Sequence, residues 1–143
     1  MTDKEKELFL QEHIYKGLKN LNTGFDAPCI YYFSAEDFKI LLERAKKLEL
    51  LIYGIEPWKD NDYYDCLVCE NYKMHASNPK WYNAAFTEFL NRNEEGLMYA
   101  ASYGIKGFEN EKEVKGSSKN KTITILKELE DLKTKLKNIT KKQ

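Results

Sequence analysis

The sequence is poor in the features that mark membrane proteins and secreted proteins. No apolar run approaches the roughly 18 residues that a membrane-spanning helix requires. The charged start, MTDKEKELFLQ, also lacks the apolar stretch of a signal peptide. We therefore expect a soluble, cytoplasmic protein with no membrane partner.

Cysteine and histidine are scarce too, with three and two copies among 143 residues. No Gly-rich phosphate loop, nucleophile elbow or paired-histidine motif accompanies them. Cys66 and Cys69 lie three apart in YYDCLVCENY, a stretch that predicts a strand, so their side chains would point to opposite faces and could not share a metal. We expect free thiols, no metal, no cofactor and no catalysis, and an unrecognised enzyme is the less favoured alternative.

The zero net charge conceals two segments of opposite sign. Residues 1–104 contain 12 Lys and Arg against 17 Asp and Glu, whereas residues 105–143 contain 11 Lys against 6 acids. The chain therefore has an acidic body of net charge −5 and a basic tail of net charge +5.

Apolar spacing and capping signals predict the order of the elements. Helix starts are signalled at three places, by Thr2 with Glu5, Ser34 with Asp37, and Asn78 with Pro79. The predicted helices cover residues 2–21, 34–48 and 78–90, and the predicted strands cover residues 29–33, 50–58, 63–72 and 97–105.

From residue 28 onward this order is that of the ferredoxin-like fold, βαββαβ. We therefore expect an α+β domain over residues 1–105, with one antiparallel four-stranded sheet and both internal helices on the same face. The strands beginning at Cys29 and Tyr63 would be central. The N-terminal helix is an addition to the ferredoxin-like pattern.

The basic tail predicts two further segments. Residues 106–121 have almost no apolar content, which is typical of a flexible linker. Residues 122–143 predict an amphipathic helix, which is too short to persist without docking on something. The residues expected to dock it are Ile125, Leu129, Leu132 and Leu136. The sequence leaves open whether it docks on its own body, on a partner, or on a second copy to form a homodimer.

The stretch LIYGIEPWKDNDYYDCLVCENY, followed by NPKWYNAAFTEFL and LMYAASYGI, resembles small uncharacterised bacterial proteins of the toxin-immunity type. The resemblance covers residues 28–105 and rests on residue texture, not on an invariant motif. It implies a stoichiometric intracellular inhibitor. An acidic inhibitor suits a basic toxin domain, because opposite charges speed association.

The candidate contact surface is the hairpin expected around KDND, where acidic and aromatic residues gather. Tyr and Trp are frequent anchors of protein interfaces. The predicted partner-binding residues are Glu56, Trp58, Asp60, Asp62, Tyr63, Tyr64 and Asp65. The alternative interpretation of this cluster is a solvated turn with the tryptophan folded into the core.

A second function class is binding of RNA or single-stranded DNA. Tyr31, Phe33 and Tyr64 lie on the strands expected to be central, where RNA-recognition modules stack bases, and the tail lysines could contact phosphates. However, the acidic body repels phosphate, and the basic-Gly-aromatic signature of those modules is absent. Protein binding is therefore the favoured function, and nucleic-acid binding is its alternative.

Overall fold

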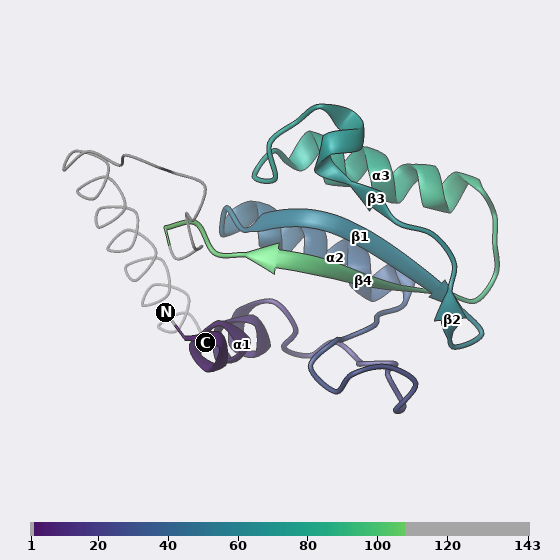
Figure 1. Cartoon of the computed structure of the whole chain (residues 1–143), viewed down its shortest axis with the longest axis horizontal. Coiled ribbons are helices and arrows are strands. Elements are labelled where there is room, and N and C mark those ends of the chain that lie inside the picture. Colours follow the sequence, from purple (N-terminus) through teal and green to yellow (C-terminus); the bar gives the residue numbers. More distant parts are fainter. Residues whose placement is uncertain (1, 108–143) are drawn as a thin grey trace. The chain divides into compact units, whose positions relative to one another are not determined.

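The computed structural model describes residues 2–107, which form an α+β fold (Figure 1). The chain divides into two units after Tyr103, and every contact given below belongs to the first unit. Most of the predicted linker and the whole predicted C-terminal helix, including its docking residues, lie outside the described residues. No helix within residues 2–107 is long and apolar enough to cross a membrane.

The three predicted helices exist, and their starts are capped as predicted. The side chains of Thr2, Ser34 and Asn78 each accept a hydrogen bond from a backbone N–H in the first turn. Within the described residues the elements are α1 (Asp3–His13), α2 (Ala35–Lys47), β1 (Leu51–Lys59), β2 (Asp62–Tyr63), β3 (Leu67–Val68), the 3-10 helix η1 (Cys69–Tyr72), α3 (Pro79–Asn91) and β4 (Leu97–Gly104).

Helix α1 ends at His13, well before the predicted end at residue 21. The N–H groups of Ile14 and Tyr15 both donate to the carbonyl of Leu10, and Gly17 then adopts a left-handed φ of 80°. A residue in this conformation turns the chain away from the helix axis. The predicted boundary was therefore wrong.

Strand β1 lies at the centre of the antiparallel sheet of four strands (Figure 1). It pairs with β2, with Trp58 opposite Tyr63, and with β3, with Gly54 opposite Val68. Strand β4 runs along its other edge. The sheet is antiparallel and has four strands, as predicted, but they are not the four predicted strands.

A β-bulge interrupts the strand that returns after the β1–β2 hairpin. The N–H groups of Tyr64 and Asp65 both donate to the carbonyl of Pro57, at 3.1 and 3.3 Å. Two residues therefore face one on β1, so β2 and β3 are two halves of the same returning strand. The strand predicted over residues 63–72 was wrong beyond Val68, because η1 begins at the next residue.

Residues 29–33, predicted to be a strand, contribute only one isolated bridge, between Phe33 and Tyr99. Hydrogen bonds with Asn20, Leu21 and Asn22 explain this difference. Asn22 Nδ2 donates to three backbone carbonyls within residues 26–30. Only the carbonyl of Ile30 belongs to the segment, but the N–H of Tyr32 also donates to Asn20 Oδ1 and the carbonyl of Tyr32 accepts from the N–H of Leu21. These bonds occupy backbone groups that a strand partner would otherwise take.

The predicted ferredoxin-like strand order is not confirmed. The strands expected in the centre were those beginning at Cys29 and Tyr63, and this expectation was wrong. The segment at Cys29 is not a strand, and β1 holds the central place instead.

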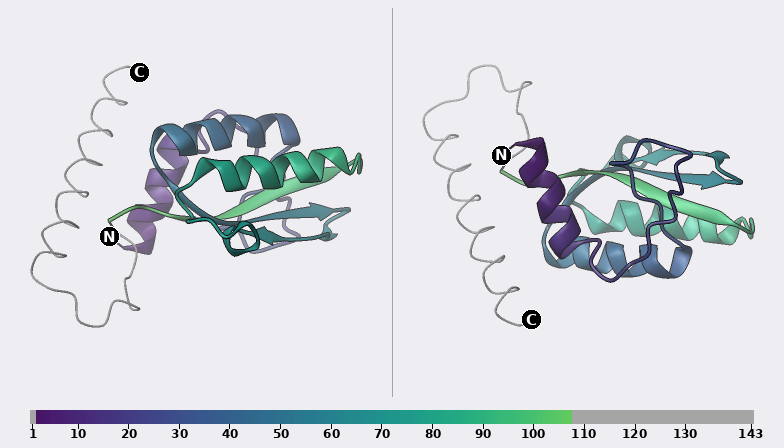
Figure 2. Two further views of the ribbon diagram at one scale, coloured as in Figure 1. Left: turned by 90° about the horizontal axis from the view of Figure 1, so that it is seen from above. Right: turned by 90° about the horizontal axis from the view of Figure 1, so that it is seen from below.

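Helices α2 and α3 lie side by side against one face of the sheet, as expected (Figure 2). Tyr99 of β4 is the centre of the core on that face. The rings of Phe38, Phe86 and Phe89 surround it, with centroid distances of 5.3, 5.2 and 6.3 Å. The opposite face of the sheet has neither of these helices.

Trp81 ties α3 to β1 and provides a test of the core. It is fully buried, and its Nε1 donates to the carbonyl of Ile52 at 3.1 Å. Trp81→Phe keeps an aromatic ring but leaves that buried carbonyl without a donor. We therefore expect the free energy of unfolding to fall by about 1–3 kcal/mol.

The matched control is Leu90→Ala on the same helix, because Leu90 is 44% exposed. It should change the free energy of unfolding by less than about 0.5 kcal/mol beyond its own helix propensity. Urea unfolding followed by circular dichroism measures both variants. Equal effects would contradict the role given to Trp81.

Candidate functional site

The β1–β2 hairpin presents an acidic tip to solvent. Asp60 and Asn61 adopt left-handed φ values of 52° and 63°, as a tight two-residue hairpin turn requires. Asp60, Asp62 and Tyr63 are exposed, and 54% of the surface of Tyr63 is accessible. Three of the predicted partner-binding residues therefore lie together at the surface.

Trp58 lies differently from these three residues. Its ring packs against Phe25 and Tyr32, with centroid distances of 5.7 and 5.3 Å. Its Nε1 is buried and makes no hydrogen bond within the described residues. Trp58 therefore holds the hairpin against the loop that precedes α2, and its ring does not stand free at the tip.

Tyr64 and Asp65 contact Arg92 at the end of α3. Asp65 Oδ2 lies 2.7 Å from Arg92 Nη1, and the guanidinium carbon lies 5.8 Å from the ring centroid of Tyr64. Burial alone would raise the pKa of Asp65, but hydrogen bonds from Arg92 and from the backbone N–H of Cys66 outweigh it. The pKa of Asp65 therefore lies below its ordinary value of 3.8.

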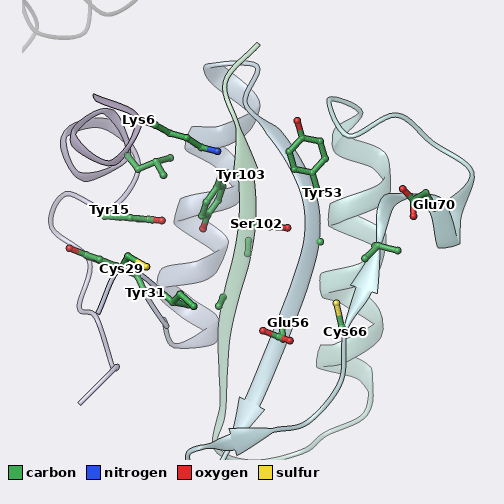
Figure 3. Close-up of a pocket in the computed structure, with 16 residues that line it drawn as sticks. Lys6, Tyr15, Cys29, Tyr31, Tyr53, Glu56, Cys66, Glu70, Ser102 and Tyr103 are labelled. Carbon is green, nitrogen blue, oxygen red and sulfur yellow. The ribbon is translucent and has the colours of Figure 1, made fainter. Parts of the chain in front are cut away.

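Glu56 lines a hollow of about 560 Å³ on the sheet face opposite α2 and α3 (Figure 3). Small residues from adjacent strands contribute to the floor of this hollow. They are Gly54 of β1 and Ala100, Ala101 and Ser102 of β4. Because small residues leave the sheet uncovered, a depression forms between the flanking walls.

One wall of the hollow is aromatic. The rings of Tyr15 and Tyr31 stack with centroids 4.4 Å apart, and Tyr103 meets Tyr15 edge-on at 5.9 Å. Tyr103 Oη is buried and makes no hydrogen bond within the described residues. Burial, and then the adjacent phenol of Tyr15, raise the pKa of Tyr103 well above its ordinary value, so this hydroxyl stays neutral.

The thiol of Cys66 is poorly suited to act as a nucleophile. Cys29, Cys66 and Cys69 are all free, and Cys69 is buried at the start of η1. Burial first, and then the carboxylates of Glu56 and Asp65, raise the pKa of Cys66. A raised pKa leaves little of the reactive thiolate at neutral pH.

Cys66 and Cys69 were predicted to point to opposite faces of one strand. This prediction was wrong in its premise, because neither residue lies within a strand. Among residues 2–107, no group of three or more His, Cys, Asp or Glu side chains is placed to hold a metal ion.

The three aromatic residues predicted to stack on bases pack against other residues of the fold. Phe33 is fully buried, and Tyr31 is stacked on Tyr15. Tyr64 is half-buried and is covered in part by Arg92. These three aromatic side chains therefore do not form an open platform for bases.

Sequence reasoning found Glu56 but missed the hollow around it. Tyr15, Tyr103 and the floor residues come from segments far apart in the chain, so no local motif joins them. The available signal was a glycine in the middle of β1 together with the run Ala100-Ala101-Ser102 in β4, since small residues inside strands often mark a close approach.

Comparison of the chain with protein families, with curated proteins and with solved structures finds no match.

The ion pair of Asp65 with Arg92 predicts a pH dependence of stability. Because the folded-state pKa of Asp65 is lowered, its ionised form stabilises the fold above the unfolded pKa. This contribution is lost as the pH falls below about 4 and through the folded pKa. The free energy of unfolding of Asp65→Asn should therefore approach that of the parent chain at low pH. Since both partners are about one-third exposed, the difference at pH 7 should not exceed about 1 kcal/mol.

Urea unfolding at several pH values between about 2 and 7 measures this convergence. Asp62→Asn is the matched control, because Asp62 is exposed and has no ion pair within the described residues. A difference between Asp65→Asn and the parent chain that stays constant across the range would show that the ion pair is not the cause.

Proposed function

We propose that this chain is a non-catalytic protein-binding module that acts as an intracellular inhibitor of the toxin-immunity type. The observation that supports this best is the exposed acidic tip of the β1–β2 hairpin, with Tyr63 accessible beside Asp60 and Asp62. Tyrosine is a frequent anchor at protein interfaces, and carboxylates around it favour a basic partner.

Two ion pairs hold the β1–β2 hairpin in place. Asp65 is paired with Arg92, and Lys59 Nζ lies 2.6 Å from Glu94 Oε2. Both pairs join the hairpin to the segment at the end of α3. Such support reduces the conformational entropy that binding would otherwise cost.

The residues of the tip have separate roles in this proposal. Asp60 and Asp62 attract a basic toxin domain over a distance and raise the association rate. Tyr63 is the anchor that lowers the dissociation rate. Trp58, which packs on Phe25 and Tyr32, keeps the hairpin in place and does not contact the partner.

The test uses the product of the gene next to the one that encodes this chain. Expressed alone in a bacterial host, that product should arrest growth, and co-expression with this chain should restore it. The purified proteins should form a 1:1 complex, and inhibition should be complete only at one equivalent. Full protection at a few per cent of one equivalent would indicate an enzyme and contradict the proposal.

Variants of the hairpin tip should separate the two kinetic roles. In stopped-flow measurements, Asp60→Asn with Asp62→Asn should lower the association rate and weaken its dependence on salt. Tyr63→Ala should raise the dissociation rate by about tenfold or more, as expected for an anchor residue.

The charge-matched control is Glu36→Gln with Glu43→Gln, since both residues are exposed on α2. It should leave both rates close to those of the parent chain. Binding that all the tip variants leave unchanged would contradict the assigned surface. Binding of single-stranded RNA in place of protein, with a steep loss in salt, would favour the alternative function.

A further inference from the structure

Glu56 is an unpaired carboxylate in the sheet-face hollow. It is half-buried, and it makes no hydrogen bond or ion pair within residues 2–107. Its charge contributes to raising the pKa of Cys66, Tyr63 and Tyr32, so the groups around it sense a negative potential. A half-buried carboxylate without a partner is satisfied most strongly by a cation with N–H donors.

Tyr103 supplies a second, independent sign of a ligand. Only 8% of its surface is exposed, it lines the same hollow, and its Oη, which lies beside the phenol of Tyr15, makes no hydrogen bond of good geometry within the described residues. An unsatisfied buried hydroxyl destabilises a fold, and such groups in native proteins call for an explanation. A polar group of a bound ligand would satisfy it.

The shape of the hollow suits an extended group. Gly54 lies on its floor, and a Cβ added there would come within 3.2 Å of Val68 Cγ1 and 3.4 Å of Ser102 Oγ. Figure 3 places Glu56 toward the hairpin end of the hollow, and Tyr53 and Tyr103 toward the other end. An aliphatic stem could therefore lie on the small residues of the floor while its charged end reaches Glu56.

The charges on the walls favour a cation over an anion. Among the lining residues are two carboxylates, Glu56 and Glu70, against one ammonium, Lys6. Lys6 comes from α1, at the end of the hollow away from Glu56 (Figure 3). An anion would be repelled at Glu56, and a wholly apolar ligand would leave both Glu56 and Tyr103 without partners.

We propose that the hollow binds one basic side chain, arginine or lysine, inserted by the protein partner. The cation pairs with the Glu56 carboxylate, the stem packs over Gly54 and Ser102, and the backbone beside it is in reach of Tyr103 Oη. Guanidinium fits best, because it offers five N–H donors in a fixed plane. The inference rests on the proposed function only in naming a protein as the source of the cation.

The first experiment is an NMR titration of the ¹⁵N-labelled full chain with the peptide acetyl-Gly-Arg-Gly-amide. Saturable shifts are expected at the amides of Gly54, Ser102 and Tyr103. The matched peptide with citrulline, which has the same shape but no charge, should bind about tenfold more weakly. Equal binding of the two peptides, or shifts confined to other regions, would overturn the proposal.

Variants then test the named groups. Glu56→Gln should weaken arginine-peptide binding about tenfold, whereas Glu43→Gln on the far side of the sheet should leave it unchanged. Tyr103→Phe should weaken binding with little loss of stability, because the hydroxyl it removes makes no hydrogen bond of good geometry within the described residues. Ser102→Leu, at an exposed floor position, should block binding while the remainder of the spectrum stays folded. Full binding in Glu56→Gln and in Ser102→Leu would overturn the assignment of the site.

Two further arms separate this inference from the proposed function. Agmatine, a free cation with the same guanidinium, should bind more weakly than the peptide, and tighter binding of agmatine would overturn a protein source. In the complex with the neighbouring gene product, Glu56→Gln should raise the dissociation rate. A complex that is sensitive to the hairpin-tip variants but not to Glu56→Gln would overturn the hollow and leave the proposed function standing.

Discussion

The central position of β1 is the constraint on which the rest of the structure depends. It pairs with β2 and β3 on one edge and with β4 on the other. The indole of Trp81 adds a hydrogen bond to the carbonyl of Ile52 from the helix layer. A strand fixed on both edges and on one face cannot slip in register without breaking all of these contacts at once. The residues of its other face are therefore presented in one arrangement.

Pro57 lies opposite the β-bulge, which gives Asp65 and Glu56 different surroundings. A proline inside a strand lacks the N–H that a ladder needs, so it is tolerated mainly at edges and bulges. Here its carbonyl accepts both N–H groups of the bulge, from Tyr64 and Asp65. The bulge turns Asp65 toward Arg92 at the end of α3, while Glu56 remains in the hollow. As a result, Asp65 takes part in an ion pair that supports the fold, whereas Glu56 has no ion pair within the described residues.

The sequence predicted the elements whose signals are local. The caps at Thr2, Ser34 and Asn78 mark helices that exist, and the turn residues around Asp60 mark a hairpin that exists. These signals are local because a cap or a tight turn satisfies backbone groups within a few residues.

The failures came from contacts that leave no periodic signal in the sequence. Residues 29–33 have strand-like composition, but the side chain of Asn22 satisfies the backbone of the preceding loop. The sequence also did not decide whether Trp58 is exposed or buried. Its neighbours Phe25 and Tyr32 belong to a loop, and the course of a loop cannot be predicted from apolar periodicity. The hollow needs small residues on β1 and β4, which are adjacent only in the folded sheet.

The polar groups of the hollow that lack partners within the described residues indicate a binding surface. A fold gains stability when buried polar groups are bonded, and two tyrosines near this site are. Gln11 donates to Tyr31, and the hydroxyl of Tyr32 donates to Asp26 at 2.6 Å. By contrast, within residues 2–107 Glu56 has no ion pair and Tyr103 Oη has no hydrogen bond of good geometry, so both reduce the stability of the free fold. Departures from local consistency of this kind are expected where a surface serves binding, because the partner supplies the missing contacts. The rigid sheet beneath them means that the depression exists before a partner arrives, so little of the binding free energy is lost in forming it.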